Sequence, residues 1–476
     1  MQKSKSGKNG FLKGAVIIAA GGFIAKLIGA LYRIPLTNLI GGEGLGLYQM
    51  VYPLYCLLLT VSATGIPSSI AALTAERLGK GDSDKGVLKS ALKLFTVIGI
   101  FGTAAMCLLA PVLARAQGKP NLISGYFALA PSVFLVSILS VFRGWFQGRN
   151  NMSPTAISEV IEQAVKVAAG LIFAYLYRTN LQKAVTYLLF SVSISELVAL
   201  IFMLIKYANY GKKFAPFQGL NETGKTTFRR ILKISIPVTL NAALIPLSGM
   251  LDSVLIVRIL SRYTSEAVSL YGLFSGGAVT VINLPVSVCY GIAAASIPAV
   301  ATAKNNGGSP RKRMLFALLI TLVVSIPCAV LLYFFAEPAV SLIYRSLAGE
   351  EKATLTRLVK LFSISAATLS CAQTLSACLT AQGKPKYAAF SMLIGVTAKT
   401  VLNVFLVRNP KWNIYGAAIA ANVCYLLAFA FDFVYNLYIT RKKRADRRGE
   451  RSDKYDYGSG TRREERRLDG ERQTGD

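Results

Sequence analysis

Three lysines stand in the middle of long apolar stretches: Lys26, Lys166 and Lys399. A charged side chain at the centre of a bilayer costs about 2.5–3.5 kcal/mol on insertion scales. Three such charges of one sign predict a cavity that holds an anion, and an anionic headgroup with sugars would also need polar side chains for its hydroxyl groups. The candidates for this cavity are Lys26, Arg33, Arg143, Lys166, Asn241, Asn283 and Gln373.

Lys166 and Arg143 each have a second interpretation that needs no ligand. Glu162 precedes Lys166 by one helical turn and Glu159 lies on nearly the same face, so this lysine can be neutralised on its own helix. Arg143 stands near the expected cytosolic end of its segment, where a long side chain can extend to the membrane surface. An anion-binding role and a structural role are therefore both open for these residues.

Lys26 and Lys399 have no acid on their own segments. Asp252 in the seventh apolar segment is the expected partner of Lys399, and Asn403 lies one turn after that lysine. The alternative to an anion site is thus a buried ion pair with an acid of another segment. Candidate acids are Asp252, Glu196 and Asp432. The residues assigned to ion pairing or coupling are Glu159, Glu162, Asp252, Lys399 and Asn403.

The segments that carry these residues are typical of a membrane protein. Of 476 residues, 53% are hydrophobic and 16% are charged, with a mean hydropathy of +0.48, whereas soluble domains carry about 25% charged residues. Twelve apolar segments, each long enough to span a bilayer, predict an all-α polytopic fold. They lie near 14–36, 46–76, 90–114, 122–146, 154–177, 184–205, 231–258, 268–302, 314–336, 358–380, 387–407 and 414–439.

The basic residues predict the orientation. Lysine and arginine are about twice as frequent in the loops on the side of the N-terminus as in the opposite loops, which predicts cytosolic termini. The net charge of +30 does not indicate nucleic acid, because the charges lie in loops between spans. The absence of histidine and of nucleophile or metal motifs predicts neither an enzyme nor a cofactor or metal site.

Repeated motifs indicate a duplicated chain. Phe146-Gln147-Gly148-Arg149 closes the fourth segment, and Ala381-Gln382-Gly383-Lys384 closes the tenth. Two parallel repeats of six spans are a known transporter plan. The expected parts are a cytosolic arm at 1–13, an N-lobe at 14–205, a cytosolic linker at 206–230, a C-lobe at 231–439 and a disordered charged tail at 440–476.

Several stretches resemble a known family. They are Lys26-Leu-Ile-Gly29-Ala-Leu-Tyr-Arg33, Arg143-Gly144-Trp145-Phe146-Gln147-Gly148, Ser248-Gly249-Met250-Leu251-Asp252 and Tyr271-Gly272-Leu-Phe-Ser275-Gly276. Over residues 11–440 the chain is similar to the stage V sporulation protein B group of polysaccharide-export proteins. That group belongs to a superfamily that also contains multidrug extruders and lipid II flippases.

The resemblance implies a fold and an activity. The fold is a V of two six-helix lobes around a central cavity, like that of the multidrug extruders. The activity is the flipping of an undecaprenyl-diphosphate-linked sugar across the bacterial cytoplasmic membrane by a monomer, in cell-wall synthesis or sporulation. The lipid II flippases carry a basic-x-x-Gly-x-x-Arg pattern in the first span. Lys26-x-x-Gly29-x-x-x-Arg33 is one residue longer, and the resemblance implies that both side chains contact the diphosphate.

Two departures from the family pattern qualify the resemblance. Lipid II flippases usually have fourteen spans, and this chain becomes charged after twelve. Some members bind sodium between spans 7, 11 and 12, where this chain has Asp252 and Lys399. We hypothesise that the Lys399 ammonium replaces the ion.

Two other functions remain as alternatives to a lipid-linked oligosaccharide flippase. A multidrug–cation antiporter of the same fold would typically need a carboxylate in the first span, which has Lys26 and Arg33 instead. A membrane scaffold without transport activity would not need cations within its spans. The expected partners are a lipid-linked anionic sugar and membrane lipids.

Overall fold

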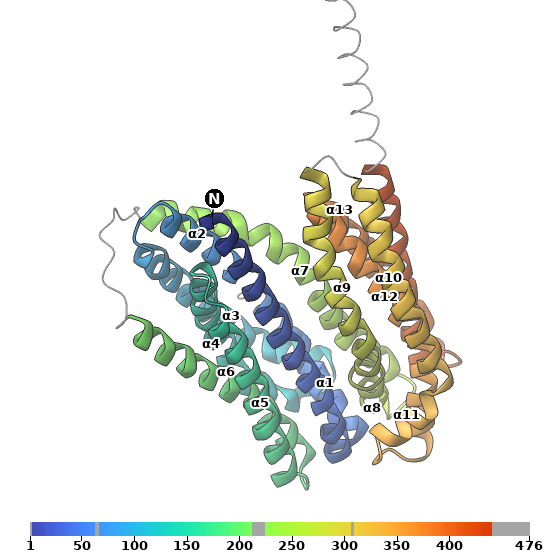
Figure 1. Ribbon diagram of the computed structural model, residues 1–476. Helices are drawn as coiled ribbons and strands as arrows, with labels where there is room; N and C mark the ends of the chain where they lie inside the picture. Colours follow the sequence, from blue (N-terminus) through green and yellow to red (C-terminus); the bar gives the residue numbers. More distant parts are fainter. Residues whose placement is uncertain (1, 62–65, 212–223, 306–308, 440–476) are drawn as a thin grey trace, which may run out of the picture.

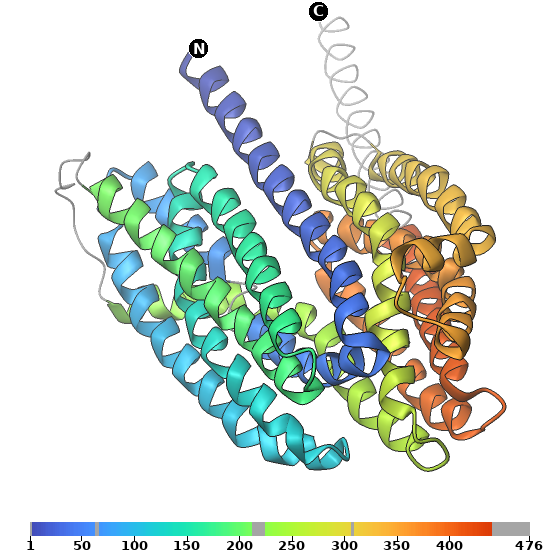
Figure 2. The ribbon, with the colours of Figure 1, turned by 90° about the horizontal axis from the view of Figure 1, so that it is seen from below.

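The computed structural model describes residues 2–61, 66–211, 224–305 and 309–439. Within these ranges, the side chains of 2–20, Lys26, 233–238, Asn241 and a few other helical residues lie outside the description. The regular secondary structure of the described residues is all helical, with turns and short loops between the helices. Figures 1 and 2 show two groups of helices that lie side by side.

The first helix contains a sharp kink. α1 (Gln2–Leu59) consists of two helices that meet at Gly41, whose φ of 65° and ψ of −172° suit glycine and few other residues. The chain therefore passes from the first expected span into the second without a loop. α2 (Ile66–Gly79) supplies the rest of the second expected segment.

The N-terminal lobe is completed by helices that pack on α1 and α2. α5 packs on α1 and α6, and α4 packs on α2, α3 and α6. Its core includes Ile70, Phe95, Phe142 and Trp145, which are all buried. The added elements are α3 (Lys85–Ala116), η2 (Pro120–Leu122), α4 (Ile123–Gly148), α5 (Ser153–Leu176) and α6 (Leu181–Gly211).

The C-terminal lobe has short helices between its long ones. α9 packs on α10 and α12, and α13 packs on α7. The elements are α7 (Gly224–Leu260), α8 (Ala267–Gly272), the π-helical η3 (Leu273–Ala278), α9 (Val279–Asn305), α10 (Pro310–Phe334), α11 (Ala336–Ile343), α12 (Gly349–Ala381), α13 (Pro385–Arg408) and a last helix, Asn413–Ile439.

The described part of the chain contains 9 helices that are long and apolar enough to cross a membrane. Large apolar side chains such as Phe101, Leu108 and Phe405 are exposed on them, as expected for a surface in contact with lipid. The predicted all-helical membrane fold is therefore confirmed, and the predicted count of twelve spans is consistent with it.

The two lobes meet at the end of the molecule opposite the N-terminus, where α1 contacts α8 and η3 (Figures 1 and 2). We call this contact the seam. Four glycines form it, Gly42 and Gly46 on α1 and Gly272 and Gly276 on α8 and η3, in two Gly-x-x-x-Gly patterns. A Cβ atom at Gly46 would collide with the carbonyl oxygen of Val268, and one at Gly276 with the Leu45 side chain. Small residues thus let the two backbones approach closely.

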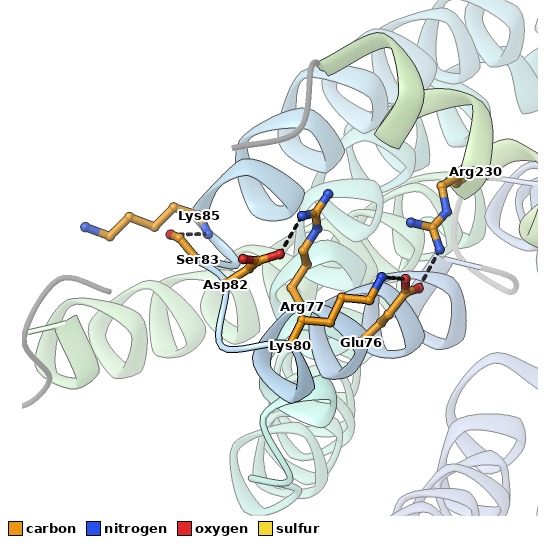
Figure 3. A network of polar contacts seen from close by, with 7 residues as sticks. All are labelled: Glu76, Arg77, Lys80, Asp82, Ser83, Lys85 and Arg230. Atoms are coloured by element: carbon orange, nitrogen blue, oxygen red, sulfur yellow. Dashed lines mark hydrogen bonds and ion pairs between the residues drawn. The ribbon is translucent and has the colours of Figure 1, made fainter. Parts of the chain in front are cut away.

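A polar network ties the start of α7 to the N-terminal lobe (Figure 3). Arg230 of α7 forms an ion pair with Glu76 of α2, and Lys80 lies 2.8 Å from the same carboxylate. The hydrogen bonds from Lys80 and Arg230 lower the pKa of Glu76, which lies outside the candidate spans. Arg77 pairs with Asp82 at 2.9 Å in the adjoining turn.

Candidate functional site

A cavity of about 450 Å³ lies between α1, α4 and α5 in the N-terminal lobe. Its polar wall brings together five of the predicted residues and one that was not predicted, Gln163. These are Arg33, Arg143, Glu159, Glu162, Gln163 and Lys166. The cavity therefore contains three cationic and two acidic side chains from three helices.

Glycines bring the first helix close to α5 and so shape this cavity. A Cβ atom at Gly21 would lie 2.6 Å from the Cβ of Ala156, and one at Gly29 would lie 3.2 Å from Oε1 of Gln163. Gly22 and Gly29 both line the cavity. Because glycine adds no side chain, α1 leaves room at these two positions beside the charged side chains of α5 that line the cavity.

Arg143 is held within the lobe rather than at the membrane surface. It is only 9% exposed, and its Nε donates to Ser158 Oγ at 2.9 Å. Its Nη2 donates to Glu162 Oε2 at 2.9 Å. The interpretation of Arg143 as an anchor that extends to the surface is therefore corrected, since a guanidinium with two fixed acceptors inside the lobe cannot reach headgroups.

Lys166 differs from its expected state. Glu162, its expected partner on the same helix, is instead paired with Arg143 from α4. Among the described residues, Lys166 forms no hydrogen bond or ion pair, although it lines the cavity and is half-buried. The expected neutralisation within α5 is thus replaced by a pairing between helices, and the lysine ammonium is available to the cavity.

Arg33 reaches from the cavity to the other lobe. It lines the cavity, and its Nη1 donates to Thr280 Oγ1 of α9 at 2.6 Å. Thr280 was not predicted, because a single threonine in an apolar segment carries no signal of such a contact. Gln163 was also missed, although it follows Glu162 on a helix whose face was already assigned to the cavity.

The C-terminal lobe contains a buried ion pair. Lys399 of α13 forms an ion pair with Asp252 of α7, and its Nζ also lies 3.0 Å from Ser248 Oγ. Asn403 Nδ2 donates to Asp252 Oδ1 at 2.9 Å. Lys399 and Asp252 are 8% and 5% exposed, so both charges are removed from solvent and depend on each other.

The other two candidate acids accept hydrogen bonds from neighbouring hydroxyl groups. Glu196 of α6 accepts a hydrogen bond from the Tyr55 hydroxyl at 3.2 Å. Asp432 of the last helix accepts one from Ser376 Oγ. Both carboxylates are buried, at 2% and 1% exposure.

The remaining predicted residues lie elsewhere or outside the description. Asn283 is exposed on α9 and Gln373 is half-buried on α12, and neither lines the cavity of the N-terminal lobe. The side chains of Lys26 and Asn241 lie outside the described residues. Their assignment to a substrate site stays a prediction.

Known families match most of the chain. Residues 11–304 match the family described as polysaccharide biosynthesis protein, and residues 237–405 match the MatE family. The first match covers more than half of the sequence. The chain belongs to the polysaccharide biosynthesis protein family.

Two curated relatives of this family member come from Bacillus subtilis (strain 168). Stage V sporulation protein B is 28% identical over 428 residues, which cover 87% of this chain and 81% of the relative. Lipid II flippase MurJ is 24% identical over 458 residues, which cover 89% and 82%. Of these two relatives, the second has an activity in its name, and that activity is the flipping of a lipid.

Solved structures show that the family member has a transporter fold. An inward-facing multidrug resistance MATE family transporter superposes with a TM-score of 0.75 at 15% identity, covering 88% of this chain and 95% of that one. Lipid II flippase MurJ in an inward closed conformation gives a TM-score of 0.68 at 15% identity, covering 88% and 87%. The predicted two-lobed, MATE-like membrane fold is thereby confirmed.

Proposed function

We propose that this protein flips an undecaprenyl-diphosphate-linked oligosaccharide or peptidoglycan precursor across the bacterial cytoplasmic membrane by alternating access. The observation that carries the proposal is the cavity in the N-terminal lobe, where Arg33 and Lys166 form no ion pair with a described residue. The similarity to lipid II flippase MurJ supports the same class of substrate.

The two cations suit a diphosphate in different ways. Arg33 offers a planar fork of donors, and Lys166 offers a compact charge with three donors. Hydrogen bonds between such groups and phosphate oxygens are roughly twice as strong as neutral ones. Gln163 offers an amide to a sugar hydroxyl, and Lys26, Asn241, Asn283 and Gln373 remain candidates for further contacts as the headgroup moves.

The ion pair of the C-terminal lobe has a different proposed role. The Lys399 ammonium is already paired with the carboxylate of Asp252. We therefore propose that this ammonium takes the place of a bound cation. The lobe would then need no metal ion for its charge balance. Sodium-dependent transport together with a cation bound beside Lys399 would contradict this role.

A multidrug–cation antiporter is the second candidate, favoured by the MatE match over residues 237–405. Such a protein needs a carboxylate that is free to exchange a cation. In the cavity Glu162 is already paired with Arg143 at 2.9 Å, and its neighbours Arg33 and Lys166 would repel a cationic drug. The charges of the site therefore favour an anionic headgroup.

Translocation in proteoliposomes tests the two candidates directly. We expect the wild type to flip a fluorescent undecaprenyl-diphosphate sugar, and we expect Arg33→Ala, Lys166→Ala and Lys26→Ala to flip it more slowly. Lys183→Ala, which changes an exposed lysine at the start of α6, is the matched control. Flipping by the cavity variants at the wild-type rate contradicts the cationic-cavity mechanism, and ethidium efflux in place of lipid flipping favours the antiporter.

The orientation and assembly belong to the same proposal. Both termini are placed in the cytosol because of the distribution of basic residues, and the protein acts as a monomer. The seam then lies on the outer side of the membrane. Protease protection of a tag at either terminus in sealed inside-out and right-side-out vesicles tests this orientation.

A further inference from the structure

Arg33 takes part in two regions at once. Its side chain lines the cavity of the N-terminal lobe, and its Nη1 donates to Thr280 Oγ1 of the C-terminal lobe at 2.6 Å. Thr280 is 6% exposed, so this contact is shielded from solvent. One guanidinium therefore joins the proposed anion site to the opposite lobe.

The hydroxyl of Thr280 has a fixed direction. It donates its only hydrogen to the carbonyl oxygen of Gly276 at 2.5 Å, so its lone pairs face Arg33 as acceptors. A valine of the same shape could not replace this function, whereas a serine could. The contact depends on one oxygen atom and hardly at all on volume.

Gly276 connects this hydrogen bond to the seam. A Cβ atom at Gly276 would collide with the side chain of Leu45 on α1, and Leu45 also lines the cavity. One residue earlier, the carbonyl oxygen of Ser275 accepts a hydrogen bond from Gln49 Nε2 at 3.0 Å. Thr280, η3 and the kinked part of α1 therefore form one continuous set of contacts across the two lobes.

We propose that Thr280 is a positioning residue that holds Arg33 toward the C-terminal lobe while the cavity is empty, and that an entering anion withdraws the guanidinium and so loosens the seam. The inference rests on the proposed function, because it needs an anion in the cavity. A phosphate oxygen is a stronger acceptor for a guanidinium than a neutral hydroxyl. Occupancy of the cavity and separation of the lobes become one linked equilibrium.

The experiment compares Thr280→Val with Thr280→Ser in the full-length protein, with inorganic pyrophosphate as the probe. Spin labels replace Glu43 and Glu350, two exposed residues on either side of the seam, and their distance distribution reports the separated fraction. Calorimetry measures the affinity for pyrophosphate in the same samples.

We expect pyrophosphate to raise the separated fraction in the wild type and in Thr280→Ser. In Thr280→Val we expect the ratio of separated to closed molecules to be about tenfold higher without ligand, since one hydrogen bond to a charged group is lost, and we expect pyrophosphate to add little. Rescue by serine distinguishes positioning from packing, because serine changes the volume and keeps the oxygen.

The outcomes separate the two proposals. A wild type that does not bind pyrophosphate contradicts the anion site and therefore the proposed function. A wild type that binds it without any change in the label distance overturns the coupling alone, and so does a Thr280→Val protein that matches the wild type with and without ligand. If Thr280→Val does not fold, Thr280→Ala removes the same acceptor and is held to the same expectations.

Discussion

Lys166 and Lys399 occupy matching places in the two lobes and have opposite surroundings. Lys166 lies 13 positions after the first residue of α5, and Lys399 lies 14 positions after the first residue of α13. Lys166 lines a cavity and forms no ion pair with a described residue. Lys399 is buried in a pair with Asp252.

The difference comes from the helix that faces each lysine. α7 packs on α13 and presents Asp252, with Ser248 one turn earlier. α1 packs on α5 and presents glycines such as Gly29, which leave room for a ligand. A lysine within a span thus enters a buried ion pair where the facing helix supplies an acid, and it stays unpaired beside a cavity where that helix supplies none.

The largest expected effect is the loss of half of the buried pair. Lys399→Ala leaves Asp252 buried without its countercharge, which should lower the free energy of unfolding by about 3–5 kcal/mol. Thermal unfolding in detergent measures it. The double variant Lys399→Met with Asp252→Asn should recover most of the loss. It leaves no buried charge, and the side-chain oxygen at position 252 still accepts the hydrogen bond from Asn403. A single variant as stable as the wild type would contradict the structural role of the pair.

Next in size is the effect of Lys166 on binding. Lys166→Ala should weaken pyrophosphate binding by about 1.5–3 kcal/mol, the range for a hydrogen bond to a charged group, which is roughly 10- to 100-fold in Kd. Its melting temperature should change little, because no described partner is left behind. Lys183→Ala controls for the loss of a surface charge. If Lys166→Ala and Lys183→Ala bind pyrophosphate equally well, Lys166 does not contribute to binding and its contrast with Lys399 is contradicted.

A smaller effect is expected for Arg143. Arg143→Met frees Glu162, which can then turn to Lys166 on the same helix. Because of this compensation, the free energy of unfolding should fall by only about 1–2 kcal/mol. A double-mutant cycle of Arg143→Met and Lys166→Met measures the new pairing as a coupling free energy. Strictly additive effects would show that Glu162 does not change partners.

The smallest effect concerns the network between α2 and α7. The pKa of Glu76 in the folded protein is lowered from its ordinary value of 4.5. Its contribution to the free energy of unfolding is therefore fully present above pH 4.5 and is lost as the pH falls through the lowered pKa. Glu76→Gln should cost about 0.5 kcal/mol near neutral pH, typical of an exposed pair. The difference from wild type should vanish in strong acid, as thermal unfolding across pH can verify. A constant difference at all pH values would exclude the charge as its cause.

The sequence predicts the fold better than it predicts the partners of each charge. Hydropathy and the basic loops are properties of single segments, so the membrane class follows from them directly. Asp252 could be named as a partner for Lys399 because few acids lie within the spans. The kink at Gly41 follows from no such pattern, because a glycine followed by another glycine is equally typical of a loop.

Contacts between helices were harder to predict. The spacing along one helix predicts a pair of Lys166 with Glu162. That spacing holds no information about Arg143, which α4 brings to the same carboxylate. Arg33 and Thr280 are 247 residues apart, and only the closed arrangement of the lobes brings them together. The sequence thus identified the charged residues of the site and could not identify which of them would be left unpaired.

The π-helical turn η3 decides which face of the following helix is turned toward the other lobe. A π-turn holds one more residue than an α-turn, so it is equivalent to a single-codon insertion that the helix absorbs as a local bulge. One residue corresponds to about 100° of rotation around a helix axis, and every position after Ala278, Thr280 included, is turned by that amount relative to α8. One extra residue is therefore sufficient to turn a different face of an apolar helix toward the other lobe. Deleting one residue within Leu273–Ala278 should reverse that step, and the protein would keep its helix while losing the contact.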